Sequence, residues 1–252
     1  MKIIVCIKQV PDTTEVKLDP KTGRLIRDGV PSIINPDDKN ALEEALRIKD
    51  ENPDTTVTVV SMGPPQADVA MREALAMGAD EAILISGREF GGSDTWATSY
   101  IIATAIKKIP DYDIIFCGRQ AIDGDTAQVG PQIAEQLNIP QITYVQKLDI
   151  EGDKVIVQRQ LEDGYTVVEA KMPVLLTAIK ELNTPRYMTP KGIFEAYNKT
   201  VQVWGFNDVP VDAEKIGLKG SPTNVNRTFS PEAKGKGIML EGADKETVKT
   251  LI

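Results

Sequence analysis

The stretch CGRQAIDGDTAQVGP, residues 117–131, carries residue types that could hold an anionic ligand. Two aspartates, Asp123 and Asp125, flank a glycine, and an expected helix follows. Neutral donors and a second glycine come next: Thr126, Gln128 and Gly130. Backbone N–H groups at a helix N-terminus attract anions, and glycine permits close approach, so the stretch suits a nucleotide phosphate. In this interpretation Asp125 caps the helix and Asp123 braces the loop through backbone N–H groups; a capped helix start without ligand fits the chemistry equally well.

Side-chain catalysis is limited by the composition, because the chain has no histidine and only two cysteines. Ser-His and Cys-His pairs, imidazole bases, His-containing zinc sites and a four-thiolate zinc site are therefore excluded. Cys6 and Cys117 sit in or at the end of apolar runs, which favours two free buried thiols over a disulfide or redox pair. Any reaction would be carried by a bound cofactor.

The chain is long enough for one large domain with appendages and is acidic, with 252 residues and a net charge of -8. An acidic balance argues against binding to nucleic acid or to anionic membranes, which attract clusters of Lys and Arg. The N-terminal stretch lacks the features of a signal peptide, and we find no apolar run of transmembrane length. We therefore expect a cytoplasmic protein without membrane insertion.

The first two thirds of the chain alternate between short Val- and Ile-rich runs and amphipathic segments. The runs are residues 2–10, 55–63, 80–86 and 112–118, and the expected helices are 36–51, 65–79, 93–109 and 126–138. Asn35 before Pro36 is typical of a helix N-cap. This order predicts an α/β fold, a parallel twisted sheet with helices on both faces and right-handed crossovers.

The pattern changes after Pro140, where alternating residues are separated by EGD and EDG turns. This predicts antiparallel strands that extend the sheet. From about Asn183 prolines and glycines recur without a long periodic element, so we expect a domain over 1–182 and a recognition loop with an extended C-terminal arm over 183–252. Such an arm is either disordered or lies on a partner subunit, and residues 243–252 could form a short helix.

Ligands of open α/β sheets bind beyond the carboxyl ends of the strands. The loops expected there are 8–12, 61–66, 86–95 and the 117–131 stretch, and the helix start at 35–38 could reach the same edge. The sequence has neither a G-x-x-x-x-G-K-[ST] phosphate loop nor a strand-linked G-x-G-x-x-G fingerprint. FGGSD at 90–94 is similar to a pyrophosphatase loop but follows the third strand, so we discount ATP hydrolysis.

Six stretches resemble the β subunit of electron-transferring flavoproteins and together cover nearly the whole chain: VCIKQVPD, INPDDKNALEEAL, VVSMGPPQ, ALAMGADEAILIS, CGRQAIDGDTAQVGPQIAEQLNIPQ and KMPVLLTAIKELNTPRYMT. The resemblance implies a fold like that of the adenine nucleotide α-hydrolases, without hydrolase activity. It also implies an obligate heterodimer with an α subunit that holds its own FAD.

One branch of this family holds AMP in the β subunit and the other holds a second FAD. The resemblance implies that the FAD branch takes electrons from NADH and bifurcates them. One goes to ferredoxin or flavodoxin, and the other passes through the α-subunit FAD to an acyl-CoA, lactate or related dehydrogenase. The alternatives are a non-bifurcating β subunit with a structural AMP and a stand-alone nucleotide-binding regulator of the stress-protein type.

CIKQVPD and QAIDGDTAQVG look like the FAD-binding, bifurcating branch. Gly124 stands where the AMP type usually has a further acidic residue, and Val129 gives QVG instead of QTG. The leucine that anchors an acyl-CoA dehydrogenase in the AMP type corresponds to Pro190, and nearby lysines are replaced by residues that include Glu195 and Tyr197. We therefore predict FAD rather than AMP.

The resemblance also assigns residue roles. Around the adenosine half it places the backbone of Cys6 and Ile7, with Asn35, Asp38, Met62 and Gly63. Around the phosphates it places Asp123, Gly124, Asp125, Thr126, Ala127, Gln128, Val129 and Gly130. Lys8 to Asp12 would lie nearer the flavin ring, where a nicotinamide must stack, and Thr95 would approach the nucleotide. Packing alone is the alternative for Cys6 and Met62, and capping alone for Asn35.

Overall fold

The computed structural model describes residues 1–12, 31–226, 235, 237, 239–242 and 244–251. These residues divide into two compact units. The larger unit, called the α/β unit below, includes 1–12 and 31–224, and the described residues of the second lie beyond 224. The second unit contains helix α7 (Lys245–Leu251), which confirms the short terminal helix expected from the sequence.

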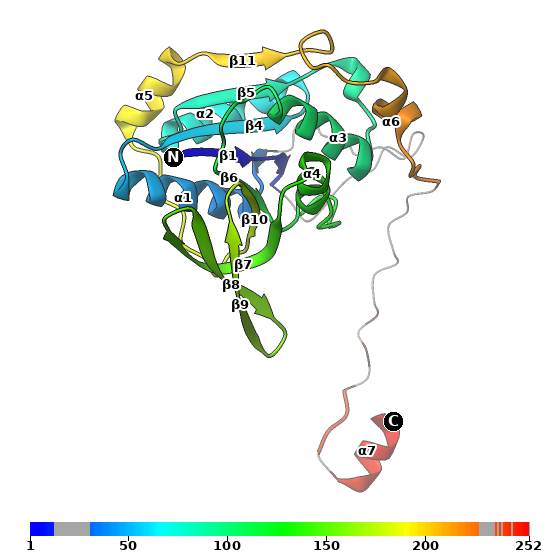
Figure 1. The fold of residues 1–252 in the computed structure, drawn as a ribbon. Coiled ribbons are helices and arrows are strands. Elements are labelled where there is room, and N and C mark those ends of the chain that lie inside the picture. Colours follow the sequence, from blue (N-terminus) through cyan, green and yellow to red (C-terminus); the bar gives the residue numbers. More distant parts are fainter. Residues whose placement is uncertain (13–30, 227–234, 236, 238, 243, 252) are drawn as a thin grey trace. The chain divides into compact units, whose positions relative to one another are not determined.

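A nine-stranded sheet forms the centre of the α/β unit, in the order β11-β5-β4-β1-β6-β10-β7-β8-β9 (Figure 1). Its strands are β1 (Lys2–Cys6), β4 (Thr56–Met62), β5 (Glu81–Ile85), β6 (Ile114–Gly118), β7 (Gln141–Glu151), β8 (Lys154–Leu161), β9 (Gly164–Lys171), β10 (Val174–Ala178) and β11 (Val201–Trp204). Every pair from β11 to β7 is parallel, and β7, β8 and β9 pair antiparallel. β2 (Gln9–Pro11) and β3 (Ser32–Ile34) form a separate antiparallel pair.

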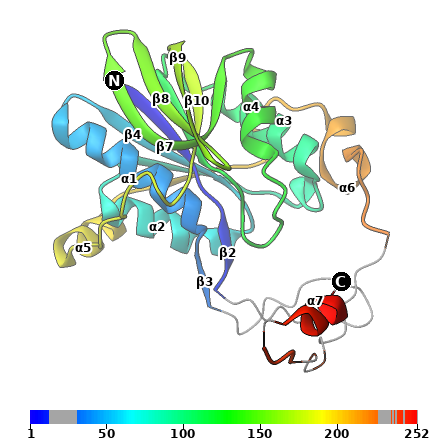
Figure 2. The same cartoon turned by 90° about the horizontal axis from the view of Figure 1, so that it is seen from below.

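Helices cover both faces of the parallel part of the sheet, as predicted. They are α1 (Pro36–Glu51), α2 (Asp68–Met77), α3 (Thr95–Ile106), α4 (Val129–Leu137), α5 (Pro190–Asn198) and α6 (Gly217–Gly220), with single turns η1 (Pro65–Ala67), η2 (Arg88–Phe90) and η3 (Ala213–Lys215). Helices α1 and α2 pack on one face and α3 and α4 on the other, as Figure 2 shows from below.

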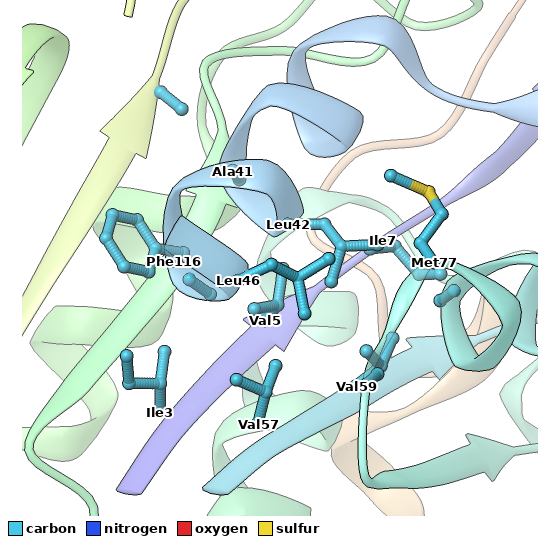
Figure 3. Packing of buried hydrophobic residues seen from close by; sticks show 14 of the residues in the cluster. Ile3, Val5, Ile7, Ala41, Leu42, Leu46, Val57, Val59, Met77 and Phe116 are labelled. Atoms are coloured by element: carbon cyan, nitrogen blue, oxygen red, sulfur yellow. The ribbon is translucent and has the colours of Figure 1, made fainter. Parts of the chain in front are cut away.

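Alternation along the strands explains the two layers. Within β1, Ile3 and Val5 belong to the cluster under α1 and α2, whereas Ile4 and Cys6 belong to the cluster under α3 and α4. Figure 3 shows the first cluster, in which Leu42 of α1 lies among strand residues. Both faces of the strand are therefore buried, as its Val- and Ile-rich composition predicts.

Strand β10 differs from the expectation of purely antiparallel strands after residue 140. It runs parallel to both of its neighbours, β6 and β7, and all five of its residues are buried. A central position buried on both faces suits the continuous apolar run VLLTA, whereas β8 and β9 are partly exposed at the edge.

The α/β unit continues past residue 182. β11 adds an edge strand beside β5, and α5 packs on α2. Further along, Val209 and Ile216 are buried in the cluster under α3, so residues 205–216 contribute to the core of this chain. These single buried residues lie in irregular chain and give no periodic signal in the sequence.

Within the described ranges, no helix combines the length and the apolar character needed to cross a bilayer.

Candidate functional site

The strand order reverses at β1, which gives the sheet a topological switch point. The chain moves from β1 to β4 and β5 on one side, then crosses to β6 on the other side. Loops after β1 and β6 diverge at such a point and leave a crevice at the carboxyl edge, where ligands of this architecture bind. The structure therefore brings the loop after β6 beside the loop after β1.

Side chains join all four loops at this edge. Lys8 Nζ forms an ion pair with Asp123 Oδ1 at 2.6 Å, which connects the loops after β1 and β6. Gln9 Nε2 donates to the carbonyl of Gln66 at 3.2 Å, and Thr95 Oγ1 lies 2.9 Å from Gln128 Oε1. Two pairs of sequence-predicted site residues are thus in direct contact: Lys8 with Asp123, and Thr95 with Gln128.

Asn35 is the N-cap residue of α1 with Pro36 after it, as predicted, but its side chain braces the loop after β6. Helix α1 begins after it with Pro36, but its side chain caps no helical N–H group. Its Nδ2 donates to the carbonyl of Gln120 at 2.8 Å, and its Oδ1 accepts from the N–H of Ile122 at 3.0 Å. The side chain is fully buried, so both of its polar ends are used by the loop.

Asp38 clamps the ends of two neighbouring strands. Its Oδ2 accepts from the N–H of Lys8 at 2.7 Å and its Oδ1 from the N–H of Gly118 at 3.0 Å. Burial raises the pKa of Asp38 to about 7, against hydrogen bonds from the Asn35 side chain and from the amides of Lys8 and Gly118 that lower it. Both oxygens are occupied, so Asp38 sets the spacing of the crevice walls.

Gly118 is a site residue that the sequence prediction missed. A Cβ at this position would lie 2.2 Å from Asp38 Oδ1 and 2.6 Å from the Asp38 backbone nitrogen. Glycine is therefore required for the clamp. The only local signal is a glycine at the end of a buried strand, which also fits an ordinary close approach or turn.

The two thiols lie directly beneath this edge. Cys6 and Cys117 are register partners on β1 and β6, and both are free and buried, which confirms the prediction of unpaired thiols. A hydrogen bond with Cys6, together with burial, raises the pKa of the Cys117 thiol. A protonated, enclosed thiol is a poor nucleophile, so packing is the role these contacts support.

Gly130 permits close packing of helix α4 on the strand ends. An added Cβ would lie 3.0 Å from Thr177 Cγ2 and 3.5 Å from Cys117 Cβ. Gly63 is similarly close to Ala67, with 3.1 Å between the two Cβ positions, and its neighbour Met62 is half-buried. Gly130 thus allows α4 to approach the strand ends, and Gly63 allows the loop after β4 to fold closely on its own turn η1.

The two aspartates of the loop after β6 hold partners different from those predicted. Helix α4 begins at Val129 without a side-chain cap, and Asp125 instead accepts from the side-chain amide of Gln120. The capping role predicted for Asp125 is therefore wrong. Within the described residues Asp123 braces the loop through the ammonium of Lys8, where backbone N–H groups were expected.

Residues 124–128 have the backbone of an anion-binding loop. The amides of Gly124 and Asp125 donate to the carbonyl of Ala121 at 3.2 and 2.8 Å. Asp125 and Ala127 have φ of 53° and 52°, left-handed values that cost non-glycine residues about 1–3 kcal/mol each. Gln128, which follows Ala127, is right-handed. A left-handed residue next to a right-handed one turns successive N–H groups toward one side, which favours a concave anion site.

The donors of this loop fit a phosphate group. Within the part of the chain that the structure describes, the amides of Thr126, Ala127 and Gln128 donate to no other group. A Cβ added at Gly124 would meet no atom of the described residues within 4 Å, so this part of the structure leaves open space there. Metal ligation has no comparable support, since the described residues contain no group of three or more Cys, Asp or Glu side chains that could hold a metal.

Comparison with known proteins adds the family context. The model of the family described as "Electron transfer flavoprotein domain" matches residues 22–209. The chain is 63% identical to an electron transfer flavoprotein subunit beta of Thermoanaerobacterium thermosaccharolyticum, over 100% of this chain and 96% of the relative. It is 60% identical to subunit CarD of a caffeyl-CoA reductase–Etf complex of Acetobacterium woodii, over 96% and 92% of the two chains. It is 54% identical to the electron transfer subunit gamma of an acryloyl-CoA reductase of Anaerotignum propionicum, over 100% and 97%.

Proposed function

Because this chain belongs to the electron transfer flavoprotein family, we propose that it is a β subunit that binds FAD at the β1–β6 crevice and bifurcates electrons from NADH. The acceptors are ferredoxin or flavodoxin and, through the FAD of an α subunit, an acyl-CoA or similar dehydrogenase. One observation carries the proposal: the uncommitted amides of Thr126, Ala127 and Gln128 at the carboxyl edge of the switch point.

The residues of the chain would bind and orient the cofactor. The amides of residues 126–128 and the Thr126 hydroxyl would hold phosphate oxygens, while Asn35, Asp38 and Gly118 keep the crevice walls in place. A bound flavin would supply hydride and single-electron chemistry, which protein side chains do not provide. Lys8 to Asp12 would border the approach of the nicotinamide.

Gly124 favours FAD over AMP in this proposal. The position has open space around it and bears no charge, so the loop can admit a larger cofactor without placing another carboxylate beside its phosphates. Two relatives are named as subunits of caffeyl-CoA and acryloyl-CoA reductase systems, which supports an acyl-CoA-type dehydrogenase as the terminal acceptor.

The nucleotide content of the purified αβ complex tests the proposal. We expect two FAD per heterodimer after denaturation and chromatographic separation of the released nucleotides. One FAD and one AMP would overturn both FAD binding by this subunit and bifurcation, and would leave a carrier with a structural AMP. Bifurcation is tested separately by the reduction of ferredoxin with NADH. We expect this reduction only when the terminal acyl-CoA substrate is present.

The surface of α5 supports a partner site. Phe194 and Tyr197 are 77% and 73% exposed, and the preceding Tyr187 is 96% exposed. The segment is nevertheless anchored, because Arg186 forms a bidentate pair with the buried carboxylate of Glu43 at 2.9 and 3.0 Å. Rigid, exposed aromatics are typical of protein interfaces, so we place the dehydrogenase contact here.

The C-terminal segment is proposed to contact the α subunit, within a cytoplasmic complex. The composition of residues 205–231 predicts that they pack against the α subunit or an associated dehydrogenase. Residues 205–216 instead pack on the core of this chain, residues 227–231 lie outside the described residues, and the chain beyond Asn224 lies outside the α/β unit. Ending the chain after Asn224 should weaken assembly with the α subunit while the urea unfolding midpoint of the α/β unit is retained. Unchanged subunit affinity in sedimentation velocity would count against this assignment.

A further inference from the structure

Strand β7 has an irregular stretch close to the carboxyl edge of the sheet. Tyr144 has φ of 58°, and the register shifts both between β10 and β7 and between β7 and β8 at this point. The N–H of Tyr144 leaves the strand ladder and donates to Thr177 Oγ1 at 3.1 Å. A positive φ is a strained conformation for an aromatic residue, and strand irregularities that redirect side chains occur often near functional sites.

Two arginines gather around the redirected ring, Arg119 from the loop directly after β6 and Arg159 from β8. The guanidinium carbons of Arg119 and Arg159 lie 5.7 Å and 6.0 Å from the centre of the Tyr144 ring. Arg159 is fixed by a hydrogen bond from its Nε to Thr143 Oγ1 at 3.2 Å. The ring thus holds two cations on one small area of a chain whose net charge is -8.

The arginines are only partly neutralised by the chain. Arg119 Nε lies 3.4 Å from Asp37 Oδ2, yet the geometry forms no hydrogen bond and this nitrogen is buried without a partner. Burial raises the pKa of Asp37, and Arg119 opposes that rise. Within the described residues, the terminal nitrogens of Arg119 and Arg159 form no hydrogen bond, and only the Nε of Arg159 has a partner. A guanidinium presents its donors in a planar fork that matches an oxyanion, so two adjacent forks with unbonded terminal nitrogens fit such a group.

We propose that Arg119, Tyr144 and Arg159 form a receptor site for an oxyanion, and that its occupant is a carboxylate side chain of the α subunit. The topology favours this source. In the sheet, β1 lies on one side of β6, whereas β7 and β8, which carry Tyr144 and Arg159, lie on the other side beyond β10. The site therefore lies on the side of β6 that carries the antiparallel strands. The choice of the α subunit rests on the proposed function.

The test uses the purified αβ complex and measures subunit affinity and nucleotide content together. Arg119→Gln and Arg159→Gln should each weaken subunit association about 10- to 100-fold, with nucleotide content unchanged. Arg159→Lys should give a smaller loss, because lysine keeps the charge and loses the fork. Tyr144→Phe keeps the ring and should behave as wild type. Lys147→Gln, an exposed cation on the same strand, is the matched control.

The two sources of an oxyanion give different results. Loss of nucleotide with unchanged subunit affinity would retain the oxyanion site but assign it to a cofactor phosphate, overturning the carboxylate. Inorganic phosphate should weaken association of the wild-type subunits more than that of the Arg119→Gln, Arg159→Gln double variant. Unchanged affinity and nucleotide content in that variant would overturn the site itself, as would a loss confined to the unfolding midpoint. Wild-type nucleotide content tests the proposed function independently.

Discussion

Replacing Asp38 with asparagine should remove a large pH dependence from the stability of this chain. The carboxyl group has a pKa of 3.8 in an exposed reference state and about 7 in the folded chain. Because the folded value is the higher one, stability is greatest at low pH, falls as the pH rises from about 4 to about 7, and is constant above that range. At about 1.36 kcal/mol per pKa unit, the total loss is about 4 kcal/mol.

The measurement is the free energy of unfolding of the full chain in urea at pH 5 and pH 8 under reducing conditions. Between these values Asp38 should account for about 3 kcal/mol of lost stability in the wild type. Asp37 and Glu44 act in the same direction, because burial raises the pKa of each, so the total slope exceeds that of Asp38 alone. The change in unfolding free energy between pH 5 and pH 8 in the wild type, minus the same change in Asp38→Asn, gives the contribution of Asp38 alone.

Asparagine also changes the clamp itself. Its NH2 group faces one of the two backbone N–H groups that Asp38 accepts, from Lys8 and Gly118, and an unmet hydrogen bond costs about 1–3 kcal/mol. The variant should therefore be less stable at pH 5 and should approach or exceed the wild type at pH 8. Asp54→Asn, in an exposed turn, controls for removal of a charge. Equal pH slopes in wild type and Asp38→Asn would refute the reasoning.

Three further predictions concern the walls of the crevice. Gly118→Ala places a Cβ 2.2 Å from a carboxylate oxygen and should lower the unfolding free energy, measured by urea titration, by about 3 kcal/mol or more. In the control Gly124→Ala the new Cβ meets open space, so its unfolding free energy should be within about 1 kcal/mol of the wild type. Equal effects would contradict the clamp. Asn35→Ala removes the partners of the Gln120 carbonyl and the Ile122 N–H at a part-buried position, and should cost about 1–3 kcal/mol with faster nucleotide release. An unchanged release rate would argue against bracing. Lys8→Gln should weaken nucleotide binding because it frees the carboxylate of Asp123, and Asp123→Asn should restore binding in the double variant.

Local sequence patterns predicted most of the fold, because the parallel strands are short apolar runs between amphipathic helices. They did not predict the place of β10. Its run VLLTA resembles the other buried strands, but it follows three strands of alternating pattern, and insertion between β6 and β7 depends on contacts far apart in the chain. The irregularity at Tyr144 was missed for a similar reason, since it is set by neighbouring strands.

The candidate site shows the same division between residue type and partner. Asn35 and Asp125 are the residue types that cap helices, and both lie close before a helix, yet each bonds elsewhere. Ile122, which bonds the Asn35 side chain, is 87 positions away in the sequence, so no local rule could identify it. Gly118 is required because of Asp38, a carboxylate 80 positions earlier.

The two acids of the loop after β6 no longer conflict with phosphate binding once their partners are known. Asp123 has 10% of its side chain exposed and faces the Lys8 ammonium at 2.6 Å, so the pair presents little net charge to the crevice. Asp125 is held by the Gln120 side chain, which keeps the carboxylate in the wall of the loop. The backbone amides of residues 126–128 donate to no other group in the described loop. A phosphate at these amides would therefore meet fixed N–H dipoles. Each acid helps to hold the loop in the strained conformation that points these N–H groups at the phosphate.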